Sequence, residues 1–182
     1  LAREFVNPSS APQLINVLTS MAAVDGNVDP SEAELIQPFA DEWNLTIDWD
    51  AIPVAASSNS RIVETQQTLT TYLNTTPPHT QVAHLLEVLQ LLINADEDCS
   101  PEEQLAFDEI SGQIRQYLSD DPVKEAFSVV IAPQDEQQDE AIRLMLKNVE
   151  VHAYAGGKGY TVGSFFSRDY AEIICAEHRS LG

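Results

Sequence analysis

Basic residues are scarce in this chain of 182 residues, which holds 9 Lys and Arg against 29 Asp and Glu and has a formal net charge of −20. A surface this acidic repels phosphate groups, which argues against nucleic-acid binding and against direct binding to anionic membranes. The same surface attracts cations, either metal ions or basic groups on another protein. The sequence therefore predicts a basic protein partner and no nucleic acid.

Cysteines and long apolar runs are also few. Cys99 and Cys175 are the two cysteines, too few for a disulfide framework, and they favour a reducing compartment. No stretch approaches the ~20 apolar residues of a membrane-spanning helix. We expect a cytoplasmic protein. Because the chain begins at Leu1 rather than Met, we also expect it to be a piece of a longer protein, and membrane association through segments outside this chain is an alternative.

A recognisable catalytic arrangement is missing as well. His79 and His84 lie five positions apart, so they do not share a helix face as paired zinc ligands do. Cys99 lies among carboxylates, which disfavour the thiolate form that a nucleophile needs. The sequence therefore predicts no enzymatic activity and no catalytic residue, and a metal-dependent hydrolase is the lowest-ranked hypothesis.

Charge and residue type divide the chain into two parts. Residues 1–119 hold 18 acidic residues against 3 Arg and no Lys, a net charge of −15, whereas residues 120–182 hold 11 acidic residues against 6 basic ones, a net charge of −5. The first part has helical periodicity, and the second has short β-branched and aromatic runs. The predicted fold class is α+β, with an all-α bundle over 1–119 and a small β-α-β-β-α domain over 120–182.

Apolar residues recur at helical spacing in five segments of the first part. The predicted helices span 12–24, 30–43, 61–74, 79–95 and 101–118, with short turns and loop over 44–60. The helix over 79–95 is the most apolar and is predicted to lie at the centre of the bundle. Trp43 and Trp49 are predicted to fill the core.

The second part reads as alternating strands and helices. Strands are predicted over 127–132, 149–154 and 160–165, and helices over 135–147 and 168–180. This order is most of a ferredoxin-like unit, whose last strand would lie beyond Gly182. The segment Gly156-Gly-Lys-Gly159 is predicted to be a hairpin turn, because a phosphate-binding loop would need Ser or Thr after Lys158.

Two segments of the first part align without a gap when the sequence is shifted by 71 residues. Each copy consists of an apolar helix, an acidic loop and a second helix. The loops read Asp25-Gly-Asn-Val-Asp-Pro-Ser-Glu32 and Asp96-Glu-Asp-Cys-Ser-Pro-Glu-Glu103, which we call the first and second acidic loops. The repeat predicts that its two apolar helices, 12–24 and 79–95, are neighbours in the core.

Helix capping accounts for part of the loop pattern. Asp29 and Ser100 are favourable N-cap residues, and a Glu three positions later completes a capping box in each loop. Capping does not explain the acidic residues that open the loops, because they follow helix C-termini, where the helix dipole disfavours negative charge.

Alternating oxygen ligands closed by a Glu suit Ca²⁺ or Mg²⁺, although Pro replaces the Gly of an EF-hand loop. The predicted cofactor is therefore a divalent cation, with no organic cofactor. The candidate metal ligands are Asp25, Asn27, Asp29, Glu32, Asp96, Asp98 and Glu103.

Two phrases in these repeats carry a family resemblance. The phrases Met21-Ala-Ala-Val-Asp-Gly-Asn-Val-Asp-Pro-Ser-Glu-Ala-Glu-Leu-Ile36 and Ile93-Asn-Ala-Asp-Glu-Asp-Cys-Ser-Pro-Glu-Glu103 resemble the tellurite-resistance TerB family and the helical domain of membrane-anchored DnaJ-like co-chaperones. The resemblance covers residues 10–119, and Glu97 departs from it where the family has Gly. It implies a compact bundle of about seven helices with acidic cation-binding loops and no enzymatic activity. It also implies an association with tellurite and other stress responses.

The end of the chain carries a shorter resemblance. The stretch Tyr160-Thr-Val-Gly-Ser-Phe-Phe-Ser-Arg-Asp-Tyr-Ala171, continued to Leu181-Gly182, is similar to the core of a SPOR domain, which implies binding to peptidoglycan glycan. Aromatic and cationic residues here suit a glycan or peptide ligand: Tyr154, Lys158, Tyr160 and Phe165.

Two main functional hypotheses follow. The first is a non-catalytic cation-binding or sensing and protein-interaction module of TerB type. The second is a metal-free acidic adaptor that docks a basic partner and carries a glycan- or peptide-binding domain at its C-terminus.

Overall fold

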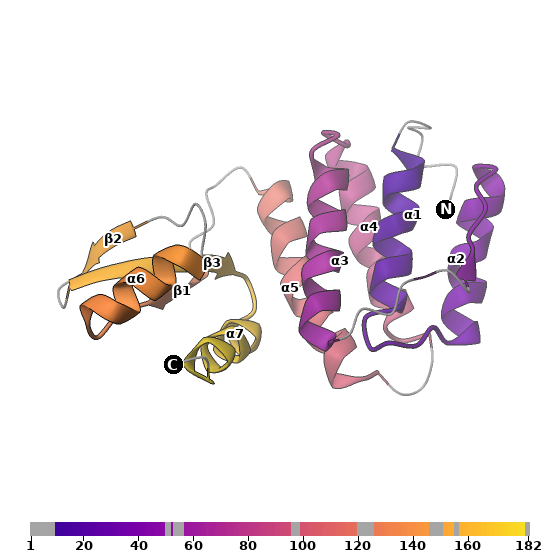
Figure 1. Ribbon diagram of the computed structural model, residues 1–182. Helices are drawn as coiled ribbons and strands as arrows, with labels where there is room; N and C mark the ends of the chain where they lie inside the picture. Colours follow the sequence, from indigo (N-terminus) through magenta and orange to yellow (C-terminus); the bar gives the residue numbers. More distant parts are fainter. Residues whose placement is uncertain are drawn as a thin grey trace. The chain divides into compact units, whose positions relative to one another are not determined.

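The computed structural model divides the chain into two compact units, residues 1–122 and 123–182 (Figure 1). It describes residues 10–49, 52, 57–95, 99–119, 126–145, 151–154 and 157–180, and we consider each unit by itself. The sequence analysis placed the boundary after residue 119. Helices combined with a small antiparallel sheet make the fold class α+β.

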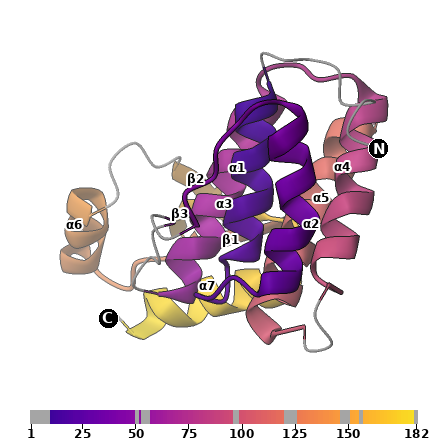
Figure 2. The ribbon, with the colours of Figure 1, turned by 90° about the vertical axis from the view of Figure 1, so that its right-hand side faces the viewer.

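The described residues of the first unit form five α-helices, one in each segment predicted to be helical. They are α1 (Ala11–Ala22), α2 (Pro30–Glu42), α3 (Ser58–Leu73), α4 (His79–Leu92) and α5 (Pro101–Leu118), and they run side by side (Figure 2). The predicted start of α3 was three residues late because Ser57 caps the helix, its Oγ accepting a hydrogen bond from the Ser60 amide at 3.3 Å. The TerB resemblance implies about seven helices, and the described residues of this unit hold five.

Helix α1, not α4, is the centre of the bundle. It contacts all four other helices, including α4, which is the neighbour that the repeat predicts. Its buried side chains form a nearly continuous apolar surface: Ala11, Leu14, Ile15, Val17, Leu18, Met21 and Ala22. The prediction for α4 was wrong because neighbouring helices cover only part of its apolar surface. Leu91, for example, is 56 % exposed.

The two tryptophans lie beside α2 and not in the core. Both are half-buried, so their predicted position was wrong. The Trp43 ring lies 5.9 Å from that of Phe39, and Trp49 Nε1 donates a hydrogen bond to Gln37 Oε1 at 3.2 Å. An indole N–H needs an acceptor, and the outer face of α2 supplies one.

The second unit follows the predicted order of strands and helices. It consists of β1 (Phe127–Ile131), α6 (Glu136–Met145), β2 (Val151–Tyr154), β3 (Gly157–Phe165) and α7 (Arg168–Ser180). The sheet order is β1-β3-β2, and both strand pairs are antiparallel. Strand β3 begins at Gly157, which pairs with Tyr154, so the predicted four-residue glycine turn was too long. Gly157 has a φ of +137°, which glycine adopts without a steric cost.

Tyr160 on β3 anchors α6 to the sheet. Its hydroxyl donates to Asp139 Oδ1 at 2.5 Å and accepts from Arg143 Nε at 2.8 Å. Arg143 also forms an ion pair with Asp139 at 2.8 Å. The hydrogen bond that Arg143 donates to Tyr160 and the negative charge of Asp139 raise the pKa of Arg143. At the other end of β3, the Phe165 ring lies edge-on to Tyr170 of α7.

Candidate functional site

The first acidic loop turns sharply after α1. The Asn27 amide donates to Asp25 Oδ1 at 2.8 Å, which closes a short turn around Gly26. Gly26 has a φ of +102°, a conformation that residues with a side chain rarely adopt. The side chain of Asp25 is thus used within its own turn.

The end of this loop is the predicted capping box. Asp29 Oδ1 accepts hydrogen bonds from the Ser31 amide at 2.8 Å and the Ser31 hydroxyl at 2.6 Å. Glu32 Oε2 accepts from the Asp29 amide at 2.9 Å, and Glu32 is 3 % exposed. The hydroxyl and amide of Ser31, which favour the charged carboxylate, lower the pKa of Asp29. Both carboxylates therefore stabilise the start of α2.

Arg61 supplies a positive charge to the first loop, and the sequence analysis missed it. Its Nε donates to the Val24 carbonyl at 2.6 Å, and its Nη2 donates to the Asp25 carbonyl at 2.9 Å. A Cβ placed on Gly26 would lie 3.3 Å from the guanidinium carbon. A cation at this end of α1 is favourable, because unsatisfied carbonyls give a helix C-terminus partial negative charge. One signal was available: no Lys or Arg other than Arg61 lies between Arg3 and Arg115.

The second acidic loop is described from Cys99 onward. Ser100 Oγ accepts from the Glu103 amide at 3.1 Å, and Glu103 Oε2 accepts from the Ser100 amide at 2.6 Å, which completes the second capping box. Glu103 is 4 % exposed. The predicted ligands Asp96 and Asp98 lie outside the described residues.

The predicted metal ligands form separate local contacts. In the first loop, Asp29 and Glu32 meet in the capping box, whereas Asp25 bonds the backbone of Asn27, whose own side chain is exposed. Among the residues that the structure describes, no group of three or more His, Cys, Asp or Glu side chains is placed to hold a metal ion. Metal binding by the second loop stays a prediction.

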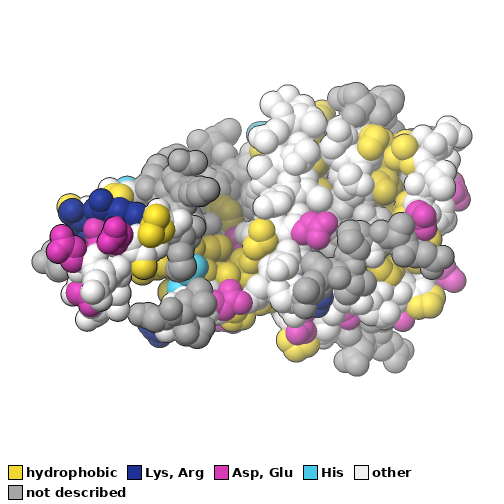
Figure 3. Space-filling view, in the orientation of Figure 1, with side chains coloured by type: hydrophobic (Ala, Val, Ile, Leu, Met, Phe, Trp, Pro, Cys, Tyr) yellow, Lys and Arg dark blue, Asp and Glu magenta, His cyan; other side chains and the backbone are white. Residues whose placement is uncertain are grey.

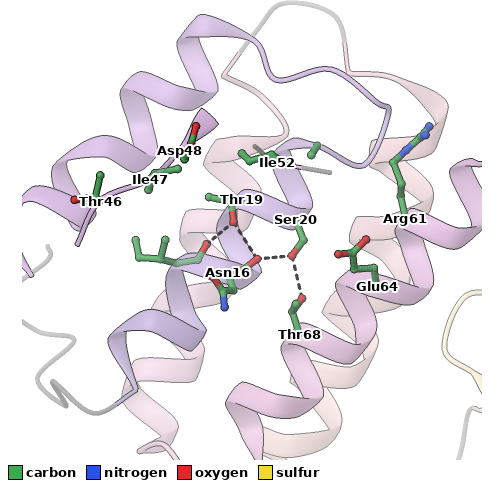
Figure 4. Close-up of a pocket in the computed structure, with 12 residues that line it drawn as sticks. Asn16, Thr19, Ser20, Thr46, Ile47, Asp48, Ile52, Arg61, Glu64 and Thr68 are labelled. Carbon is green, nitrogen blue, oxygen red and sulfur yellow. Dashed lines mark hydrogen bonds between the residues drawn. The ribbon is translucent and has the colours of Figure 1, made fainter. Parts of the chain in front are cut away.

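A pocket adjoins the first loop on the side of Arg61. It has a volume of about 330 Å³ and lies between α1, the segment after α2 and α3 (Figure 4). Hydroxyl, amide and carboxylate groups line it together with isoleucine side chains: Ile15, Asn16, Thr19, Ser20, Ala23, Thr46, Ile47, Asp48, Ile52, Arg61, Glu64 and Thr68. The sequence analysis did not find this pocket, because its walls come from segments far apart in the chain.

Charge is distributed differently over the two units. Figure 3 shows most of the Lys and Arg side chains of this face on the second unit, beside Asp and Glu side chains, and scattered Asp and Glu side chains on the helical unit. In the second unit, two residues predicted to contact a glycan are turned inward. Tyr160 is 2 % exposed and Phe165 is half-buried. Lys158 is exposed.

The chain matches no known family model, no curated protein and no solved structure. Among the helices described, none combines the length and the apolar character that crossing a membrane requires.

Proposed function

We propose that this chain is a non-catalytic binding protein whose acidic helical unit docks a basic protein partner. The observation that carries the proposal is the charge of residues 1–119, where 18 acidic residues face 3 Arg and no Lys. One of these arginines, Arg61, is directed at backbone carbonyls of the first loop. Most of the acidic residues therefore have no basic side chain of their own unit to neutralise them.

The first loop has a structural role in this proposal. The capping box uses the carboxylates of Asp29 and Glu32 to start α2. Arg61 balances the partial negative charge at the C-terminal end of α1. A metal ion at this loop would have to share carboxylates that already accept hydrogen bonds from backbone amides. The TerB resemblance, with its link to stress responses, is compatible with a binding role and adds no catalytic group.

Cation sensing at the second loop is the second candidate function. Asp96, Asp98 and Glu103 lie in a stretch, residues 62–114, that contains no Lys or Arg. The repulsion among three consecutive acidic residues there is relieved by a bound divalent cation. In this version of the proposal the second loop alone responds to Ca²⁺ or Mg²⁺.

We extend the proposal to the second unit, as a ferredoxin-like or SPOR-like domain that binds a peptide. The order β1-β3-β2 is that of a ferredoxin-like sheet without its last strand, which would lie beside β1. A peptide that pairs with the outer edge of β1 would take that place. The inward position of Tyr160 leaves fewer aromatic rings for stacking on a glycan, so a peptide is favoured.

Binding of a lysine-rich peptide to the full chain tests the main proposal. The affinity should fall as salt rises, because attraction between exposed charges is screened over ~8 Å at physiological ionic strength. Neutralising Glu34 and Glu87, both exposed on the helical unit, should weaken binding. The same change at Glu136 and Glu140, exposed on α6, is the matched control. An affinity that does not change with salt concentration, or an equal loss of affinity in both variants, would contradict the proposal.

Thermal unfolding with and without millimolar Ca²⁺ or Mg²⁺ tests the second candidate. A cation that binds the folded chain raises the Tm by preferential binding. Asp96→Asn should abolish that rise, and Asp25→Asn should leave it intact. A Tm that does not respond to either ion leaves capping as the function of both loops.

A further inference from the structure

The floor of the pocket beside α1 consists of hydroxyl groups on facing turns of α1 and α3 (Figure 4). Thr19 Oγ1 donates to the Ile15 carbonyl at 3.0 Å, and Thr68 Oγ1 donates to the Thr65 carbonyl at 2.8 Å. Ser20 Oγ lies 2.9 Å from Thr68 Oγ1, which joins the two helices. A hydroxyl has a single proton and two lone pairs. Thr19 and Thr68 give their protons to backbone carbonyls, so their oxygens keep lone pairs that can accept hydrogen bonds. The floor therefore mainly accepts hydrogen bonds.

Two carboxylates lie on opposite sides of Ile52 along the pocket (Figure 4). They belong to Asp48, in the segment after α2, and to Glu64 on α3, and both residues are exposed. Arg61 is the basic residue among the described lining residues, and its Nε and Nη2 donate to carbonyls of the first loop. These bonds hold the guanidinium at the first loop without removing its charge, and Asp48 and Glu64 are the two negative points of the described lining.

Apolar side chains form much of the remaining wall, beside Asn16 and Thr46. Ile15, Ala23, Ile47 and Ile52 line the space between the polar groups. The volume of about 330 Å³ is at the lower end of the range for small-molecule pockets. A short aliphatic chain fits this combination of size and apolar lining.

We propose that this pocket binds a small linear aliphatic diamine. An ammonium group offers donors and no acceptor, which complements a lining of hydroxyl oxygens and carboxylates. Its two charged ends would pair with Asp48 and Glu64, and its methylene groups would lie against the isoleucines. An anionic ligand would face like charge at both points. Asp48 and Glu64 are two of the 18 acidic residues behind the docking proposal, and the apolar walls of the pocket are what the diamine site adds to them.

Isothermal titration calorimetry of the full chain with diaminobutane, at constant ionic strength, tests this inference. We expect saturable binding of one diamine, weaker binding of butylamine, and no binding of butanediol, which has the same chain length without charge. No saturable binding of the diamine, or equal binding of the diol, would overturn the inference.

Two lining variants and one control sharpen the test. Glu64→Gln and Asp48→Asn should each lower the association constant for diaminobutane about tenfold, to the level of butylamine, because each removes one charge-assisted contact. Glu34→Gln, on the exposed part of α2 and outside the pocket lining, should leave the constant unchanged. If Glu34→Gln weakens binding as much as Glu64→Gln, the diamine responds to general charge and the pocket assignment fails. That outcome would leave the protein-docking proposal standing, since general charge attraction is what it requires.

Discussion

The first acidic loop meets the guanidinium of Arg61, whereas the second lies in a stretch with no Lys or Arg from residue 62 to residue 114. Both loops end in the same capping box, so the starts of α2 and α5 are stabilised in the same way. The loops differ in how the charge at the end of the preceding helix is balanced. In the first copy Arg61 supplies the cation, and residues 62–114 around the second copy hold no Lys or Arg that could do the same.

The difference between the loops separates two properties of the repeat, helix capping and excess negative charge. The positions shared by both loops, an N-cap residue, a Pro and a Glu, serve helix initiation. The positions that open the loops carry the excess charge, and there the two copies share the first Asp and differ at the next two positions. Similarity between repeats is therefore better evidence for capping than for metal binding.

Removing Arg61, which is present at the first loop only, should have the largest effect on the free energy of unfolding. Arg61→Met removes two charge-assisted hydrogen bonds to the first loop and should lower the free energy of unfolding by about 2–3 kcal/mol. Denaturant unfolding followed by circular dichroism measures the loss. Arg115→Met, an exposed change near the end of α5, is the control and should stay within about 0.5 kcal/mol of the wild type. Equal effects of the two changes would mean that Arg61 does not stabilise the loop.

A side chain at Gly26 should have the next largest effect. Gly26→Ala forces a φ of +102° on a residue with a Cβ, and that Cβ would meet the Arg61 guanidinium at 3.3 Å. The expected loss is about 1–2 kcal/mol of unfolding free energy. The sequence has Glu97 at the matching position of the second loop, so Glu97→Gly should not be destabilising by a comparable amount. A fully stable Gly26→Ala variant would contradict the geometry of the first loop.

Loss of the second N-cap should be smaller. Ser100→Ala removes the acceptor for the Glu103 amide and should cost about 1 kcal/mol. Ser100→Asp, which copies the first loop, should restore most of that stability and so shows that the two boxes are interchangeable. Thermal unfolding of both variants, with exposed Ser119→Ala as a control, measures the effect. If Ser100→Asp is no better than Ser100→Ala, the boxes are not equivalent.

The smallest expected effect is a difference in acid sensitivity. Since Ser31 lowers the pKa of Asp29 in the folded state, the unfolded chain binds the proton more readily. The contribution of Asp29 is present above the ordinary Asp pKa of about 4 and is lost as the pH falls through its lower folded value. Asp29→Ser should therefore flatten the decline of stability in acid, as measured by denaturant unfolding at a series of pH values. Curves that stay parallel to the wild type would contradict this assignment.

Local patterns predicted much of the fold and the capping part of the site. Apolar spacing located five helices, and the Asp29–Glu32 and Ser100–Glu103 spacings predicted both capping boxes. These features are set by residues within a few positions of one another. The β-α-β-β-α order was also readable, because strand and helix periods differ.

The contacts that sequence reasoning missed join distant segments. Arg61 lies 36 positions from the Asp25 carbonyl that it bonds, and no local pattern signals such a pair. Helix α4 was predicted at the centre because it has the highest apolar content. The exposed Leu91 shows that burial depends on which neighbouring helices cover a side chain, not on its residue type alone. The pocket depends on the meeting of Ser20 with Thr68, 48 positions apart.

The central place of α1 has a consequence for synthesis of the chain. This helix leaves the ribosome first among the five, yet 79 positions separate its end at Ala22 from the start of α5 at Pro101. Until α5 has emerged, part of the apolar surface of α1 lacks its final neighbour. Nascent chains that end before residue 101 would then expose hydrophobic side chains to aggregation or to chaperones. Folding of the helical unit is thus tied to completion of its last helix.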